Sequence, residues 1–193
     1  MIEVKQASMV ENSNEYLADI FVEGFYNWLY FFSKDKAKLK RAFKHIFILD
    51  KFYVGIQTGK VVGMTAVSDG KSLVVKLNKK ELTKNLGFIK GRLAYIVLRK
   101  EFETIGKHDL PMLPEIAFVS VLKEYRRQGV AETIINHIIK LNLYDKYLLE
   151  VADNNTSAIK LYEKLGFIEY QRIPVKNAKQ AGFENYLYMI RDK

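Results

Sequence analysis

The sequence predicts an α/β (α+β) fold, in which a mixed central sheet of about six to seven strands carries helices on both faces. Strand-like runs rich in β-branched and aromatic residues alternate with segments whose apolar residues recur every three or four positions. A tight turn at residues 58–60 indicates an antiparallel hairpin. A strand–helix–strand order over residues 115–151 indicates a parallel pair. One sheet therefore combines both kinds of neighbour.

The first part of the chain is expected to supply a strand, two helices and the hairpin. Residues 2–7 are expected to form the strand, and apolar residues from Leu17 to Phe32 follow helical spacing. A basic helix is expected over residues 36–47. The hairpin strands cover residues 52–56 and 61–67.

The middle of the chain departs from a simple alternation of strands and helices. Residues 78–103 are expected to be helical, with a capping box formed by Asn78 and Glu81 and a break at Gly87. Residues 104–114 are expected to form a loop. The last third then predicts a strand at 115–122, a helix at 130–141, a strand at 147–151, a helix at 155–165 ended by Gly166, and closing strands at 167–172 and 186–191.

Composition limits the classes of protein. The 193 residues contain no linker rich in Pro, Gly or Ser, so one domain over residues 1–193 is expected. The lack of cysteine excludes disulfides, thiolate metal sites and a cysteine nucleophile, and the spacing of the three histidines predicts no metal site. Because no secretory signal and no uninterrupted membrane-length apolar segment is visible, a soluble cytoplasmic protein, either monomer or homodimer, is expected.

The net charge of +9 is unevenly distributed. Residues 34–60 carry eight Lys or Arg against two acidic residues, and residues 71–107 carry ten against three. Such a surface attracts anions, including cofactor phosphates and nucleic acid. The basic segments lack the interleaved aromatic residues typical of nucleic-acid binders, so a solvated surface is the simpler interpretation and nucleic acid is not the expected partner.

A short basic turn between a strand and a helix predicts an anion site. The strand beginning at Glu115 leads into Arg126-Arg127-Gln128-Gly129-Val130-Ala131, and a helix follows directly. The first turn of a helix has unpaired N–H groups and the positive end of the dipole. Gly129 permits close approach of a ligand to the backbone, and the neighbouring side chains supply charge and hydrogen-bond donors around a pyrophosphate.

This turn resembles the [Gln/Arg]-x-x-Gly-x-[Gly/Ala] signature of the GNAT acetyltransferase superfamily. Arg127 departs from the pattern, since the family usually has glycine there. A second segment, Asn155 to Phe167, is similar to the family's Asn-x-x-Ala-x-x-x-Tyr-x-x-x-Gly-Phe segment. Helical spacing puts Asn155, Ala158 and Tyr162 on one face. The resemblance is strong over residues 114–172, and the order of elements in residues 1–70 agrees with the family fold.

The resemblance implies that acetyl-CoA binds between a splayed pair of parallel strands, with no metal involved. The pantetheine arm would contact Val119, Ser120 and Val121, the turn from Arg126 to Ala131 would hold the pyrophosphate, and Asn155 and Ala158 would contact the arm. A backbone N–H near Val119 would polarise the thioester carbonyl. The amine would attack directly, and Tyr162 would protonate the departing thiolate.

The attacking amine needs a base, because an alkylammonium with a pKa of about 10 is not nucleophilic near neutral pH. Glu115 occupies a position resembling that of the base in histone-type members, and an ordinary acid at a strand start is the alternative. Aromatic residues between Phe21 and Phe32 are explained mainly by core packing, although one or two rings and Glu23 are candidates to face the acceptor.

The family interpretation predicts transfer of an acetyl group to a primary amine of a small molecule or peptide. A CoA-binding regulatory domain with little turnover is the alternative. Typical members join the strands that precede and follow residues 71–113 by a short connection, so this basic, helical segment is an atypical insertion. The acceptor is not predicted, because acceptor residues lie on variable loops.

Overall fold

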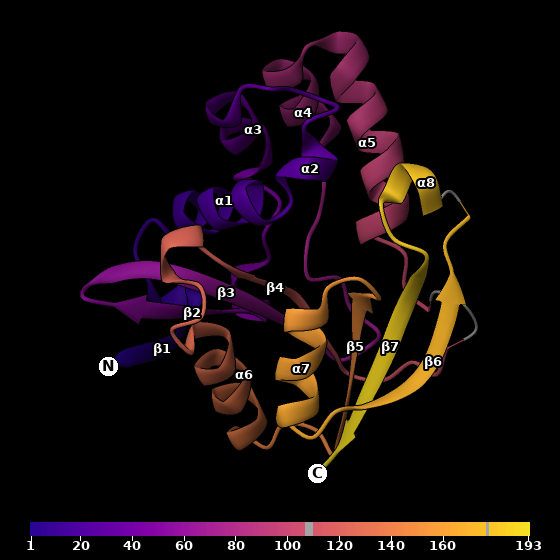
Figure 1. Cartoon of the computed structure of the whole chain (residues 1–193). Coiled ribbons are helices and arrows are strands. Elements are labelled where there is room, and N and C mark those ends of the chain that lie inside the picture. Colours follow the sequence, from indigo (N-terminus) through magenta and orange to yellow (C-terminus); the bar gives the residue numbers. More distant parts are fainter. Residues whose placement is uncertain (107–109, 177) are drawn as a thin grey trace.

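A mixed seven-stranded sheet forms the centre of the molecule, which confirms the expected fold class (Figure 1). The computed structural model describes residues 1–106, 110–176 and 178–193. The strand order is β1-β2-β3-β4-β5-β7-β6, with a parallel β4–β5 pair and antiparallel neighbours elsewhere. The strands are β1 (Ile2–Gln6), β2 (Phe52–Gln57), β3 (Lys60–Ser68), β4 (Glu115–Val121), β5 (Lys146–Ala152), β6 (Ile168–Pro174) and β7 (Asn185–Asp192).

Helices cover both faces of the sheet, as the sequence predicts (Figure 1). The first face carries α1 and the helices stacked beyond it, over a core that includes Phe21, Phe43 and Phe52. The second face carries α6 and α7, over a core that includes Ile134 and Tyr147. The helices are α1 (Ser13–Gly24), α2 (Tyr26–Leu29), α3 (Lys36–Phe43), α4 (Lys79–Leu86), α5 (Phe88–Phe102), α6 (Val130–Lys140), α7 (Thr156–Lys164) and α8 (Ala178–Ala181).

The expected single helix from Leu17 to Phe32 is wrong, because the helix breaks at Phe25. The Phe25 N–H donates the last hydrogen bond of α1 to the Phe21 carbonyl, but the backbone angles of Phe25 (φ −111°, ψ 16°) are not helical. The break lets the Phe25 ring pack 5.1 Å from that of Phe21 and 5.8 Å from that of Phe118. Long-range packing therefore overrides the helical spacing of the sequence.

The helix expected over residues 36–47 ends earlier, at Phe43. The chain beyond it pairs with residues 74–76: Ile48 N donates to the Val74 carbonyl, and Lys76 N donates to the Ile46 carbonyl at 2.7 Å. These backbone groups serve a two-strand bridge and are not available to a helix. The spacing of apolar residues in the sequence does not distinguish a helix that continues to residue 47 from a helix that ends at Phe43 and is followed by this bridge.

The predicted helical segment 78–103 is present as α4 and α5, separated at Gly87 (φ +87°). Asn78 caps α4, accepting hydrogen bonds from the N–H groups of Lys80 and Glu81. The reciprocal half of the capping box is absent, because the Asn78 N–H donates to Nε2 of His45 at 2.9 Å. Residues 107–109 of the expected loop at 104–114 lie outside the described residues.

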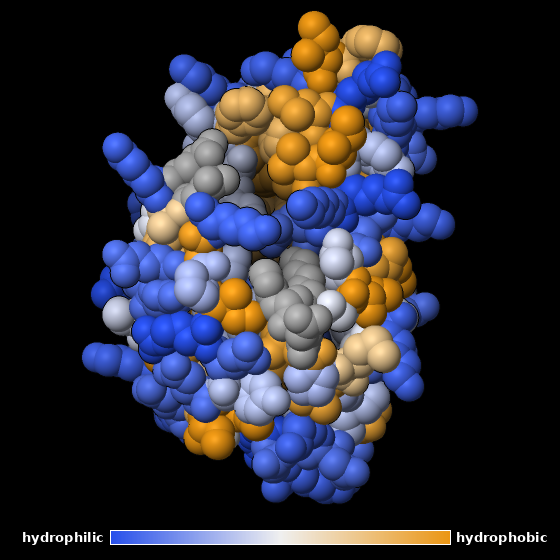
Figure 2. All heavy atoms as spheres, turned by 90° about the vertical axis from the view of Figure 1, so that its right-hand side faces the viewer, coloured by the Kyte–Doolittle hydropathy of each residue, from blue (hydrophilic) through white to orange (hydrophobic). Residues whose placement is uncertain are grey.

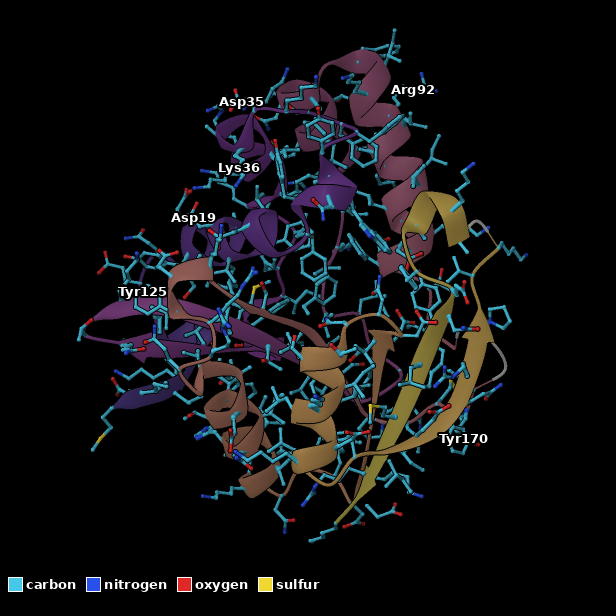
Figure 3. The ribbon with its side chains drawn as sticks, in the orientation of Figure 1. Asp19, Asp35, Lys36, Arg92, Tyr125 and Tyr170 are labelled. Atoms are coloured by element: carbon cyan, nitrogen blue, oxygen red, sulfur yellow. The ribbon has the colours of Figure 1, made fainter. Side chains whose placement is uncertain are left out.

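Helix α5 carries apolar side chains on an outer surface of the molecule. Figure 2 shows them gathered at one end of the molecule, over α5, where Phe88, Ile89 and Ile96 are all more than 60% exposed. Arg92 also extends outward from this helix (Figure 3). Across the described ranges, no helix is both long enough and apolar enough to cross a membrane. One-domain organisation of residues 1–193 stays a prediction.

Candidate active site

The parallel strands β4 and β5 separate shortly after they begin. They are paired only at Glu115↔Leu148 and Ile116↔Leu149, and beyond these positions β4 keeps β3 as its neighbour while β5 keeps β7. Figure 1 shows the two halves of the sheet diverging from this point. The separation confirms the expected splayed pair and opens a gap through the middle of the sheet.

A bulge in β4 lies at the edge of this gap. Ala117 opposes Ala66 and Ser120 opposes Met64, so Phe118 and Val119 together lie opposite a single residue of β3. Phe118 has a positive φ of 52°. The bulge turns Phe118 toward the core under α1 and Val119 toward the core under α6. It also interrupts the β3–β4 ladder at the predicted thioester position.

A cavity of about 800 Å³ occupies the gap between the strands. Its walls come from β4, β5, β7, α5 and the residues that follow α5, and from α7. Four of the predicted site residues line it together: Glu115, Val119, Asn155 and Tyr162. The remaining predicted cofactor residues lie outside its lining: Ser120 and Val121 on β4, Arg126 to Gly129 before α6, Val130 and Ala131 in the first turn of α6, and Ala158 on α7.

Tyr162 is a buried residue of the cavity lining. Only 6% of the residue is exposed, its ring packs edge-on at 6.2 Å from that of Phe167, and the described side chains offer its hydroxyl no hydrogen-bond partner. Burial raises the pKa of Tyr162 to about 12. The phenol is therefore protonated at neutral pH, which is the form that an acid catalyst requires.

Asn155 and Ala158 lie on the N-terminal turn of α7. The Asn155 side chain caps the helix, accepting a hydrogen bond from the Ala158 N–H at 3.3 Å, as the sequence predicts. Ala158 is partly buried against the same core as Tyr162. The polar Asn155 and the small Ala158 therefore place no large side chain at this end of α7, beside the gap.

The predicted anion turn has the expected backbone geometry. Gly129 is in the left-handed region (φ +79°), α6 begins directly after it, and no described side chain caps this N-terminus. A Cβ on Gly129 would meet no atom within 4 Å, so its backbone conformation, not crowding, favours glycine. The N–H groups of Val130 and Ala131 belong to this open first turn.

Arg127 also adopts a left-handed conformation, with φ of +59°. A non-glycine residue pays for this conformation, which explains physically why glycine suits the position. Arg126 and Gln128 are held by the turn itself: Arg126 Nε donates to the Val121 carbonyl at 3.0 Å, and Gln128 Nε2 donates to the Glu124 carbonyl at 2.8 Å. All three long side chains are exposed.

Two predicted roles depend on side-chain direction. The buried Ser120 hydroxyl donates to the Ile20 carbonyl of α1 at 3.3 Å, so only the Ser120 backbone is directed along β4 toward the gap. Glu23, a candidate for the acceptor side, accepts a short hydrogen bond from the Lys123 N–H and is not part of the cavity lining. Among the aromatic residues, Phe25 and Trp28 do line the cavity.

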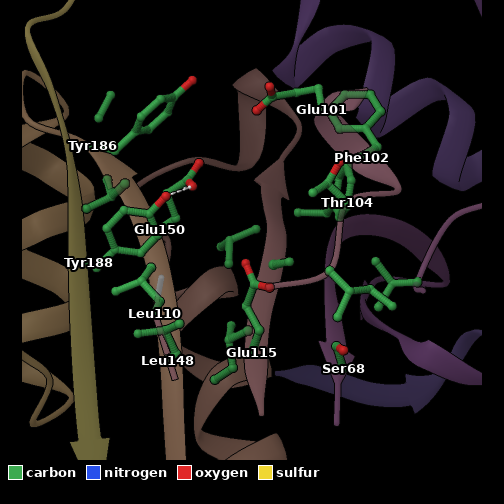
Figure 4. A pocket seen from close by; sticks show the side chains of 18 of the residues that line it. Ser68, Glu101, Phe102, Thr104, Leu110, Glu115, Leu148, Glu150, Tyr186 and Tyr188 are labelled. Atoms are coloured by element: carbon green, nitrogen blue, oxygen red, sulfur yellow. Dashed lines mark hydrogen bonds between the residues drawn. The ribbon is translucent and has the colours of Figure 1, made fainter. Parts of the chain in front are cut away.

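Sequence reasoning missed Glu150, which lies on β5 and lines the cavity beside Tyr188 of β7 (Figure 4). The Tyr188 hydroxyl donates to Oε2 of Glu150 at 2.6 Å. Burial and, next, the negative charge of Glu150 raise the pKa of Tyr188, so this phenol stays a donor. The available signal was a single acidic residue within the apolar strand Tyr147–Val151.

The splayed sheet, the open anion turn and the cavity in the gap between β4 and β5 agree with the fold class that the sequence predicts. A family model described as the acetyltransferase (GNAT) family matches residues 15–167. The chain therefore belongs to the GNAT acetyltransferase family.

Curated relatives match over shorter stretches. The chain is 33% identical over 106 residues to an N-alpha-acetyltransferase of Saccharolobus solfataricus, covering 51% of this chain and 62% of that relative. It is 33% identical over 84 residues to an N-alpha-acetyltransferase of Sulfurisphaera tokodaii, covering 40% and 50% respectively. The matches thus span less than two thirds of either relative.

Solved structures support the fold over the whole chain. An N-acetyltransferase of Staphylococcus aureus Mu50 superposes with a TM-score of 0.59 at 18% identity, covering 97% of this chain and 99% of that one. The ribosomal-protein-S18-alanine N-acetyltransferase of Escherichia coli gives a TM-score of 0.52 at 16% identity, covering 100% and 94%. At these identities the likeness concerns the fold.

Proposed function

We propose that this protein transfers the acetyl group of acetyl-CoA to a primary amine by direct attack. The observation that carries the proposal is the cavity through the splayed strands, which the buried Tyr162 lines together with Glu115 and Glu150. Family membership supplies the class of reaction. The intracellular supply of acetyl-CoA makes the cytoplasm the proposed location.

The cofactor site fits acetyl-CoA along a path of backbone groups. The open N–H groups after Gly129 suit a pyrophosphate, and the exposed Arg126 and Arg127 add positive charge beside it. The edge of β4 from Val119 to Val121, with Ala158 across the gap, would take the pantetheine arm. The N–H of Val119 in the bulge would then donate to the thioester carbonyl and stabilise the oxyanion.

Two carboxylates are candidates for the base. Their positions in the β4–β5 pairing decide which one we place first. Glu115 is at the first paired position of β4, whereas Glu150 lies one residue beyond the last paired position of β5, where the gap opens. Glu150 thus lies further along the sheet, toward the register of the bulge, and we place it first in accepting the proton of the ammonium, directly or through water. Glu115, the residue expected from the sequence, stays a prediction as an alternative base.

Acetyl transfer breaks the carbon–sulfur bond of the thioester and forms a carbon–nitrogen bond. The departing thiolate takes a proton, for which Tyr162 is the proposed source because its phenol is protonated and lines the cavity. General acid catalysis of this kind contributes about 10²- to 10⁴-fold.

The test is calorimetric titration with acetyl-CoA, followed by release of free thiol with a panel of primary amines. Binding with amine-dependent release, lost in Tyr162→Phe, supports the enzyme. Glu115→Gln and Glu150→Gln, compared at saturating acetyl-CoA, rank the two bases. Binding without release from any amine would instead support a CoA-binding regulatory domain, and absence of binding would remove both.

A further inference from the structure

The inserted segment forms one wall of the cavity. Glu101 and Phe102 at the end of α5, and Thr104 just after it, are among the lining residues (Figure 4). The insertion is fixed there by ring packing, since the Phe102 ring lies 5.3 Å from that of Phe118 and 6.0 Å from that of Phe21. The bulge of β4 and the end of α5 therefore hold each other in position.

The insertion also brings a further carboxylate into the cavity. Glu101 comes from α5, Glu115 from β4 and Glu150 from β5, and Figure 4 shows their side chains on different sides of the same space. Burial and then the negative charges of Glu101 and Glu150 raise the pKa of Tyr186, so this residue lies within the field of both carboxylates. Among the lining residues that the structure describes, the charged side chains are these three carboxylates, in a chain of net charge +9.

One carboxylate is sufficient to bind and deprotonate the reacting amine, and the proposed function places Glu150 first in that role. Glu101, on the wall formed by the end of α5, is a further carboxylate that the transfer step does not require. We propose that the acceptor carries a second cationic group, which Glu101 binds while the reacting amine lies against Glu150. This inference rests on the proposed acetyl transfer and names its substrate class. Tyr162, which is only 6% exposed and lines the same cavity, independently marks this space as one built for a ligand.

Two sources of such a dication fit the chemistry: a small diamine or polyamine, and a peptide whose amino terminus is followed by a basic side chain. In either case each ammonium group gains a charge-assisted hydrogen bond to a different carboxylate. The second contact is made before and during the reaction alike, so it improves binding of the acceptor more than it improves the chemical step.

The experiment compares matched acceptors at saturating acetyl-CoA. One arm pairs butylamine with 1,4-diaminobutane, and the other pairs tetrapeptides with norleucine or lysine at the second position. We expect kcat/KM to be about tenfold or more higher for the dicationic member of at least one pair, since hydrogen bonds to charged groups are worth this much. The arm with the preference identifies the source.

Variants separate this inference from the proposed function. Glu101→Gln should lower kcat/KM for the dication about tenfold, mainly through KM, and should lower kcat/KM for the matched monocation much less. Glu11→Gln removes an exposed carboxylate outside the cavity lining and is the charge-matched control. Equal rates for both members of each pair, or a preference that survives in Glu101→Gln, would overturn the inference even though acetyl transfer is observed. If none of the amines supported release of free thiol from acetyl-CoA, the proposed function itself would be overturned.

Discussion

The hydroxyl of Tyr188 donates a 2.6 Å hydrogen bond to Oε2 of Glu150, and the two residues are directly opposite each other in the β5–β7 ladder. Their separation is thus fixed by the sheet, because cross-strand neighbours lie within side-chain reach by geometry alone. One carboxylate oxygen is held by the tyrosine, which orients the carboxylate within the cavity. Tyr188 accordingly acts as a positioning residue for the proposed base.

Replacing this donor tests the pair. Tyr188→Phe should lower kcat/KM about tenfold or more, since a hydrogen bond to a charged group is lost. Glu150→Gln should cause the larger fall, of about 10²-fold or more, because it removes the proposed base. If the two act as one unit, the double variant should be no slower than Glu150→Gln alone. Fully additive losses in steady-state kinetics would contradict the positioning role.

Local signals in the sequence are sufficient for part of the site. The positive φ of Gly129 and the helix after it follow from a basic glycine turn, and the cap at Asn155 follows from residue type and position. Helical spacing likewise places Ala158 and Tyr162 on one face of α7.

The acidic side of the cavity depends on contacts between distant residues. Whether Glu150 borders a gap is decided by where β4 and β5 separate, and Glu101 lies at the end of α5 that Phe102 packs against Phe118. The bulge at Phe118 also depends on contacts between distant residues. So does the hydrogen bond from the Asn78 N–H to His45, which takes the place of the expected bond to Glu81. Periodicity and local motifs carry no information on such pairings, so these residues could not be predicted from the sequence.

The pH dependence of Tyr162 follows from its burial. Its pKa is raised from 10.0 to about 12, so the protonated form that donates to the thiolate persists throughout neutral and moderately alkaline pH. We expect Tyr162→Phe to lower kcat about 10²-fold or more at every pH up to about 10. The pH profile of kcat in the native protein should show no alkaline fall in this range that is absent from the variant. A fall centred near pH 9 that disappears in Tyr162→Phe would contradict the raised pKa.

Arg127 is predicted to affect stability and cofactor binding in opposite directions. Its φ of +59° is costly for a side chain with Cβ, so Arg127→Gly should raise the melting temperature slightly, by relief of about 1 kcal/mol. Loss of the guanidinium should weaken acetyl-CoA binding at low salt and reduce the salt dependence of the affinity. Arg127→Asn is the control, because Asn tolerates this conformation while keeping a polar side chain. Unchanged affinity in both variants would show that Arg127 makes no contribution to the anion site.

The contact between α1 and β4 is predicted to leave no room for a side chain larger than that of glycine at position 24. A Cβ added at Gly24 would overlap Oγ of Ser120 and lie 3.1 Å from its Cβ, on a serine that is buried and hydrogen-bonded to the Ile20 carbonyl. Gly24→Ala should therefore lower the free energy of unfolding by about 1–3 kcal/mol, the usual cost of overpacking.

Ser120→Ala in the same chain removes the overlapping oxygen and should restore part of this stability, a non-additive result that thermal unfolding would detect. Because the Ser120 hydroxyl is turned toward α1, Ser120→Ala alone should leave the acetyl-CoA affinity unchanged in a calorimetric titration. A large loss of affinity would instead mean that the serine side chain reaches the cofactor. The combination of a stability change without an affinity change would assign the Ser120 side chain to packing and leave its backbone to the proposed cofactor edge of β4.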